Sequence, residues 1–122
     1  MDNIKKIIER LDKFQTERRL LQTALAKPPD DSDDSAPDSD VLEARLASCE
    51  RSLRYTQKKI FNVLKRIKDP QMYNILEARI FARLTMDEIA EQMFFDVRTA
   101  YRLKEKAYRE FNRIMNEMER TL

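Results

Sequence analysis

Glycine, histidine and tryptophan are all absent from the 122 residues of this chain, and cysteine occurs once, as Cys49. Without glycine the backbone has few positions that adopt a positive φ easily, so glycine-rich phosphate-binding loops are not expected. A single cysteine excludes an intrachain disulfide and suits a reducing compartment. With no histidine and one thiol, the sequence lacks the ligands of a zinc site, and we expect neither a metal nor another cofactor.

Long apolar stretches are missing as well. No run approaches the roughly 18 apolar residues of a membrane span, and the N-terminal MDNIKKIIERLDKF is amphipathic, unlike a signal peptide. We therefore expect a cytoplasmic protein without a membrane partner.

Catalytic groups are equally scarce. There is no histidine to act as a general base and no serine–base pair, and acidic and basic residues alternate along the exposed faces of the expected helices. We predict that the protein is not an enzyme, has no catalytic residues and takes no small-molecule substrate.

The residues that are present favour helices. Leu, Ala, Glu, Lys, Arg, Met and Gln dominate, whereas Val is sparse, and the four prolines lie outside the periodic segments or at their edges. The fold class is therefore predicted to be all-α.

The net charge is only +2, but the charged residues are unevenly distributed along the chain. Residues 28–40 carry six aspartates and no base, whereas residues 41–69 carry eight basic against three acidic side chains. Because proline, serine and mutually repelling aspartates dominate it, the segment 27–40 is predicted to be a disordered loop. It lacks the glycine and the terminal glutamate of a calcium-binding loop. A solvating connection and a segment that imitates the charge of nucleic acid both stay open as its role.

Apolar residues recur at spacings of three and four over residues 4–26 and 41–68, as in coiled-coil helices. Each helix would span roughly 35–40 Å, while a flexible connection of this size spans about 20 Å. The loop easily joins neighbouring ends of antiparallel helices, whereas parallel helices would need it to cross nearly the full helix length, so the antiparallel arrangement is preferred. Residues 1–69 are predicted to form an antiparallel helical hairpin for oligomerisation or partner binding.

The apolar seam of the helix predicted at residues 41–68 is the candidate oligomerisation surface. Two helices alone make a thin core, so a second hairpin could complete it in a homodimer, or the hairpin could close on itself. Arg18 and Thr56 occupy seam positions, where polar residues set the register at some cost in stability. The candidate oligomerisation residues are Leu46, Cys49, Leu53, Ile60, Val63 and Ile67.

Residues 70–122 predict three further helices. Asp69 can cap the first, Pro70 suits its first position, and it is expected to end near Arg83. A short second helix should follow the Thr-x-x-Glu capping box at residues 85–88. Phe94 and Phe95 would form a turn before the long last helix.

Two details point to a helix-turn-helix. Ala90 is small where the short helix and the last helix would cross, and Asp96 can cap the last helix. The second helix of such a motif presents its N-terminal residues to the major groove of DNA. Residues 96–109 include five basic and two acidic residues. The candidate DNA-binding residues are Arg98, Thr99, Tyr101, Arg102, Lys104, Lys106 and Arg109.

The pattern Leu84-Thr85-x-x-Glu88-Ile89-Ala90-Glu91-x-Met93, followed by a cap and a basic helix ending in Lys106-Ala107, resembles region 4 of bacterial sigma factors. The resemblance covers roughly residues 70–115, and the size and layout are similar to those of small phage-encoded transcriptional regulators. It implies a promoter-reading module in a bacterial or phage-infected cell, and a region that also contacts RNA polymerase. Two residues depart from the pattern: Phe94 stands where the turn usually has glycine, and Asp96 replaces a Ser or Thr cap.

Three interpretations of residues 70–122 follow. The first is a sequence-specific, dimeric transcription regulator that contacts guanine through arginines and phosphates through lysines. The second is an interaction module for RNA polymerase or another regulator, with the helix-turn-helix as a scaffold. The third is three ordinary packed helices with a solvated basic face. A basic cluster also precedes residue 70, and it is either a solvated helix face or a set of flanking phosphate contacts. Its members are Lys58, Lys59, Lys65, Arg66 and Lys68.

Overall fold

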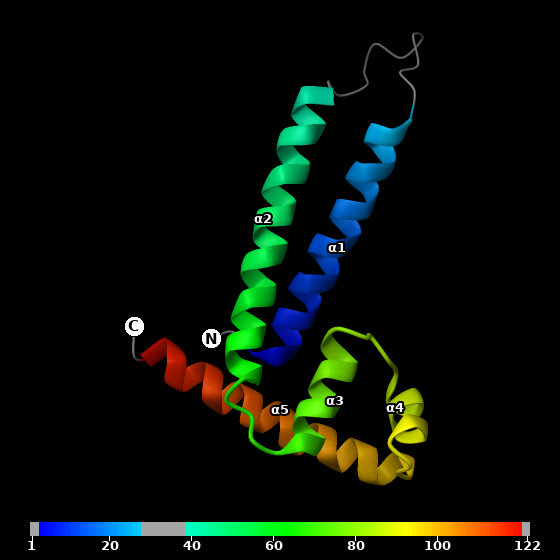
Figure 1. The fold of residues 1–122 in the computed structure, drawn as a ribbon, viewed down its shortest axis with the longest axis vertical. Helices are drawn as coiled ribbons and strands as arrows, with labels where there is room; N and C mark the ends of the chain where they lie inside the picture. Colours follow the sequence, from blue (N-terminus) through cyan, green and yellow to red (C-terminus); the bar gives the residue numbers. More distant parts are fainter. Residues whose placement is uncertain (1–2, 28–38, 121–122) are drawn as a thin grey trace. The chain divides into compact units, whose positions relative to one another are not determined.

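The computed structural model describes residues 3–27 and 39–120, which form an all-helical protein (Figure 1). Along the described chain the helices are α1 at Ile4–Ala26, α2 at Ser39–Leu64, α3 at Pro70–Ile80, α4 at Met86–Gln92 and α5 at Val97–Arg120. The described ranges contain no strand, which confirms the predicted all-α class. Among these residues, no helix has the length and apolar composition needed to cross a membrane.

Most of the acidic segment 27–40 lies outside the described residues, so its disorder stays a prediction. Its last two residues, Ser39 and Asp40, already belong to α2, which begins two residues before the expected start at Val41. Asp40 lies in the first turn, where a carboxylate is favoured by the partial positive charge of the helix N-terminus.

The chain divides into two compact units, residues 7–59 and residues 1–6 with 60–122. The division falls inside α1 and α2, so its bounds differ from the expected halves 1–69 and 70–122. We refer to residues 7–59 as the hairpin unit and to the remainder as the three-helix unit, because the latter contains α3, α4 and α5.

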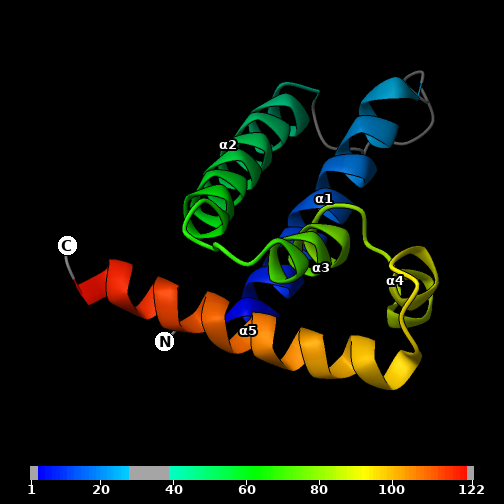
Figure 2. The ribbon, with the colours of Figure 1, turned by 60° about the horizontal axis from the view of Figure 1, so that its bottom comes forward.

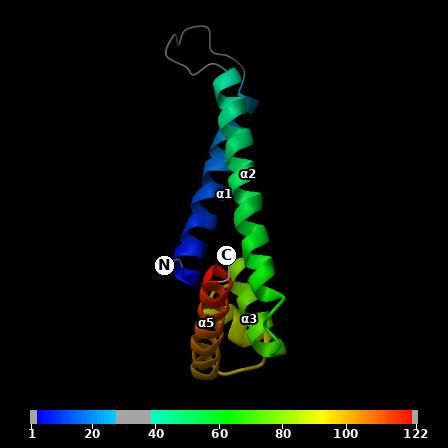
Figure 3. The same cartoon turned by 90° about the vertical axis from the view of Figure 1, so that its left-hand side faces the viewer.

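Within the hairpin unit, α1 and α2 run antiparallel beside each other, as predicted (Figures 1 and 3). The thiol of Cys49 donates a hydrogen bond to the carbonyl of Phe14 at 3.2 Å, which ties the two helices together. Thr56 is buried at its seam position, and its hydroxyl donates to the carbonyl of Ser52 at 2.9 Å. The buried side chains of this unit are Ile7, Leu11, Leu21, Cys49, Leu53 and Thr56.

α2 ends at Leu64, four residues before the predicted end at Lys68. Beyond it, two amides bond to carbonyls three residues back at 3.0 Å, so a tighter turn closes the helix. Asp69 is extended, with φ −74° and ψ 116°. This conformation follows from Pro70, whose ring disfavours a helical residue before it.

α3 begins as predicted and ends early. The carboxylate of Asp69 accepts hydrogen bonds from two amides of the first turn at 2.9 and 3.2 Å, and Pro70 takes a first-turn position. The helix stops at Ile80 instead of Arg83, because Arg83 adopts a left-handed φ of 56°. The next amide then reaches back to the carbonyl of Ala78 at 3.0 Å, a common way to end a helix.

The core of the three-helix unit lies where α3 and α4 pack against α5 (Figure 2). Ala100 and Ala107 of α5 are 0% exposed, and their small side chains let the neighbouring helices approach closely. The start of α1 belongs to this unit too, since the Ile4 amide donates to Oδ1 of Asn112 at 2.8 Å. The other buried residues are Ile4, Ile60, Val63, Leu64, Ile67, Ile75, Leu76, Ile80, Met86, Ile89, Ala90, Phe111, Ile114 and Met115.

Candidate nucleic-acid interface

The predicted capping box is present at the start of α4. The hydroxyl of Thr85 accepts a hydrogen bond from the amide of Glu88 at 3.2 Å, and the Glu88 carboxylate accepts one from the amide of Thr85 at 3.3 Å. Ile89 and Ala90 are buried, whereas Met93 is only half-buried. α4 is therefore a short helix with a well-defined beginning and one buried face.

The turn between α4 and α5 contains residues 93–96. Phe94 adopts a left-handed backbone with φ 58°, at the place where glycine was expected. For a residue with a Cβ this conformation costs roughly 1–2 kcal/mol. The amide of Phe95 bonds to the carbonyl of Ala90 at 2.9 Å, and its ring is half-buried. The ring of Phe94 is instead 95% exposed, so the turn keeps a glycine-like path with an aromatic side chain in solvent.

Asp96 caps α5, as predicted. Its Oδ1 accepts a hydrogen bond from the amide of Thr99 at 2.7 Å. The backbone amide of Thr99 and then its hydroxyl lower the pKa of Asp96, and Arg102 adds to this effect. A hydrogen-bonded cap therefore stays ionised at the start of the candidate DNA-binding helix.

Four candidate DNA-binding residues form the basic face of α5: Arg98, Arg102, Lys106 and Arg109. At about 100° of rotation per residue, they lie on the side opposite the buried alanines. All four side chains are exposed. Among the residues that the structure describes, Arg98, Lys106 and Arg109 take part in no ion pair. Their charges thus face solvent without a carboxylate partner in the described part of the chain.

Thr99 and Tyr101 flank this basic face on α5, and both are exposed. Sequence reasoning missed Val97, whose side chain is 43% exposed in the first turn of the helix. Its spacing of four residues from Tyr101 was the available signal, because such pairs share one side of a helix.

Lys104 is arranged differently from the other candidates. Its ammonium lies 5.2 Å from the ring centre of Tyr101 and 5.3 Å from that of Tyr108, and its side chain is half-buried. A cation over two aromatic faces is attracted to both. The hydroxyl of Tyr108 in turn accepts a long hydrogen bond of 3.5 Å from Nε of Arg79 on α3. Lys104 therefore joins two rings of α5, and one of these rings contacts α3.

The basic face stops where glutamates begin to pair with arginine. Arg113 contacts Glu110 through Nη2 and Glu117 through Nη1, the latter at 2.7 Å. The hydrogen bond from Arg113 lowers the pKa of Glu110, and both carboxylates raise the pKa of Arg113. Surface pairs of this kind add little stability, but they neutralise Arg113.

The candidate oligomerisation residues are mostly covered within their own chain. Cys49 and Leu53 are buried in the hairpin unit, where Leu46 is half-buried. The other three, Ile60, Val63 and Ile67, are buried in the three-helix unit. They thus serve packing inside one chain, and oligomerisation through them stays a prediction.

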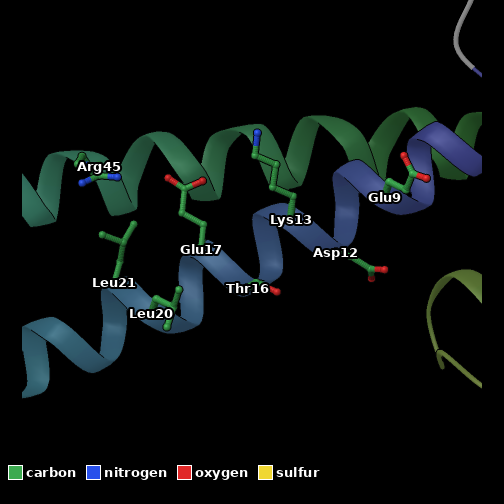
Figure 4. Close-up of a pocket in the computed structure, with 8 residues that line it drawn as sticks. All are labelled: Glu9, Asp12, Lys13, Thr16, Glu17, Leu20, Leu21 and Arg45. Carbon is green, nitrogen blue, oxygen red and sulfur yellow. The ribbon is translucent and has the colours of Figure 1, made fainter.

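Among the hollows on the described residues, two are lined by side chains of both charges. A trough of 720 Å³ runs along the hairpin unit, where Lys13 and Glu17 of α1 point towards α2 near Arg45 (Figure 4). A second hollow of 370 Å³ in the three-helix unit has Arg66, Lys68 and Arg113 beside two carboxylates. Because cations and carboxylates alternate in both, neither favours a ligand of one charge.

The basic face of α5 is therefore the strongest candidate site. No cluster of metal-ligating side chains occurs among the described residues. Comparison of the chain with family models, with curated proteins and with solved structures gives no match. The resemblance to region 4 of sigma factors accordingly stays a prediction from the sequence.

Proposed function

We propose that this protein is a sequence-specific DNA-binding transcription regulator of a bacterial or phage-infected cell, whose α5 enters the major groove. The observation that carries this proposal is the exposed basic face of α5, directly after the capped α4 and its short turn. The major groove of B-DNA, about 12 Å wide, admits a helix. Arg98 and Arg102 lie in the first two turns and can donate to guanine, while Lys106 and Arg109 are placed for phosphates.

The charges of α4 favour the same orientation. Asp87, Glu88 and Glu91 are all exposed, and α4 contains no basic residue. Because α4 turns its buried face towards α5, these carboxylates point away from the core that the two helices share. Phosphates would be repelled by α4 and attracted by α5, so α5 is the helix that faces DNA.

We also propose that the protein binds DNA as a homodimer. Two-fold symmetry would place two copies of α5 in successive major grooves about 34–36 Å apart, and the target would be palindromic. The predicted seam residues are largely covered within one chain. The second copy would therefore contact the exposed apolar residues of the hairpin unit, which are Leu20, Val41 and Tyr55.

The first experiment is selection from random duplex DNA at about 0.15 M salt, a concentration at which non-specific binding is weak. Purified full-length protein should enrich one motif, and a repeated half-site would support the dimer. Weak retention that disappears as salt rises, with no enriched motif, would contradict sequence-specific binding.

Variants then test the basic face. Arg98→Ala and Arg102→Ala should each weaken binding to the enriched site by about 1–3 kcal/mol. Lys106→Gln should weaken binding to all sequences and lower the salt slope by about one charge. Arg54→Ala is the matched control, because Arg54 is an exposed arginine of the hairpin unit. Wild-type affinity in both α5 arginine variants would refute the proposal.

Phe94 favours a second candidate function, binding to RNA polymerase or another protein. A 95% exposed aromatic ring on a strained turn is the kind of side chain that anchors protein interfaces. On this view, Phe94→Asn should abolish binding to purified RNA polymerase and leave DNA affinity unchanged. Equal polymerase binding by wild type and variant would remove this candidate.

A further inference from the structure

The first two turns of α5 carry an apolar row beside the arginines. Val97 and Tyr101 are four residues apart, so their Cβ atoms lie roughly 5–6 Å from each other on one side of the helix. Their side chains are 43% and 47% exposed. Arg98 and Arg102 each follow by one residue, which places them about 100° further around the helix. An apolar row and a cationic row thus run in parallel on the part of α5 nearest its start.

The ring of Tyr101 is held in place in this row. The ammonium of Lys104 lies 5.2 Å from its centre and also contacts Tyr108, which is hydrogen-bonded to Arg79 of α3. A side chain that is already oriented loses less conformational freedom on binding. Tyr101 is therefore an apolar surface prepared for contact, and Lys104 is its positioning residue.

The charges beside the row restrict what can cover it. Arg98 and Arg102 favour an anionic partner, and that partner must present apolar groups a few ångströms from its hydrogen-bond acceptors. The major groove of DNA does this, because guanine presents O6 and N7 there and thymine presents its 5-methyl group. The paired rows match a duplex in which thymine lies beside guanine.

We propose that Val97 and Tyr101 recognise thymine 5-methyl groups next to the bases that Arg98 and Arg102 contact. This inference rests on the proposed function and adds a base preference to it. It predicts half-sites with adjacent thymine and guanine, and an affinity that depends on a single methyl group per thymine.

Deoxyuridine provides the test, because it pairs as thymine does but lacks the methyl group. Selection is run in parallel on two random libraries, one with thymine and one with deoxyuridine, using the full-length protein. The thymine library should yield a motif that contains thymine. Replacing each contacted thymine of that motif with deoxyuridine should weaken binding about fourfold, the loss expected for one buried methyl group.

Two variants connect this loss to the apolar row. In the wild type, the site with thymine should bind about four times more tightly than the site with deoxyuridine. Val97→Ser and Tyr101→Ser should each bring this ratio towards one, at the thymine that the replaced residue contacts. Arg98→Ala should weaken binding to both sites equally and keep the ratio. Phe94→Asn is the apolar control, since the Phe94 ring is 95% exposed and lies in the turn outside the apolar row. It should change neither affinity nor ratio.

The outcomes separate the two proposals. If neither library yields a motif, the proposed DNA reading fails, and the methyl recognition fails with it. If both libraries yield the same motif with affinities within twofold, the protein reads DNA but the methyl inference is wrong. An undiminished thymine preference in both serine variants would overturn it as well.

Discussion

The two units differ in how completely their own helices cover their side chains. In the three-helix unit, α3 and α4 pack on α5, and Ile75, Leu76 and Phe111 are 0% exposed. The hairpin unit has two helices facing each other, and Leu46 stays half-buried while Leu20 is 66% exposed. The difference indicates that the proposed DNA-binding helix rests on a well-packed core, whereas the hairpin unit has a thinner core of two helices, and both units leave apolar residues exposed.

The largest effect is expected from Phe111→Ala in the core of the three-helix unit. Phe111 is fully buried on α5, and removing its ring leaves a cavity in the layer that supports the basic face. The free energy of unfolding should fall by about 3–5 kcal/mol. Urea denaturation followed by circular dichroism measures this change. A loss below about 1 kcal/mol, typical of surface positions, would show that this core is not tightly packed.

Leu53→Ala tests the hairpin unit in the same way and should cost less. Leu53 is 2% exposed, but a two-helix layer can relax around a cavity more easily, so we expect a loss of about 2–3 kcal/mol. Arg54→Ala, at an exposed position of the same helix, is the control and should stay within about 0.5 kcal/mol of wild type. If Leu53→Ala costs as much as Phe111→Ala, the proposed contrast between the units is wrong.

The fold features that the sequence predicted well are set by neighbouring residues. The beginning of α4 follows from Thr85 and Glu88, which satisfy each other across one turn, and the cap of α5 follows from Asp96. Helix ends were predicted less well. α3 stops early because Arg83 takes a left-handed conformation, and its composition gave no sign of this.

The contacts of Lys104 were missed, although both of its rings lie three or four residues away on the same helix. The contact of Tyr108 with another helix could not be predicted, because it depends on how the helices pack. Lys104 was expected to meet phosphates with the other cations, but its ammonium lies over two rings, and Tyr108 is placed by Arg79 of another helix. The exposure of Val97 also depends on how α4 and the turn cover the start of α5. The basic face itself was predictable, because only the 3.6-residue period is needed to place it.

A smaller effect of opposite sign is expected from Phe94→Asn. The left-handed φ of 58° suits asparagine better than phenylalanine, and the lost ring is 95% exposed, so little packing is removed. The variant should be about 1 kcal/mol more stable than wild type. The midpoint of urea unfolding measures the gain, with Arg98→Ala, also at an exposed position, as a control for the loss of a surface side chain. A less stable variant would mean that the ring does pack in solution, and it would weaken the case for Phe94 as a protein-binding anchor.

The smallest effect is a change in pH dependence from Asp96→Asn. Hydrogen bonds from Thr99 lower the pKa of Asp96 in the folded chain, so ionised Asp96 favours folding. Its contribution is complete above the unfolded pKa of about 3.9, and it is lost as the pH falls through the lower folded pKa. Asparagine caps a helix about as well at every pH. Urea midpoints from about pH 7 to pH 2 should therefore fall less steeply for the variant below about pH 5. Parallel curves would mean that the Asp96 cap adds nothing that depends on its charge, so its contribution would come from the neutral hydrogen bond that asparagine also makes.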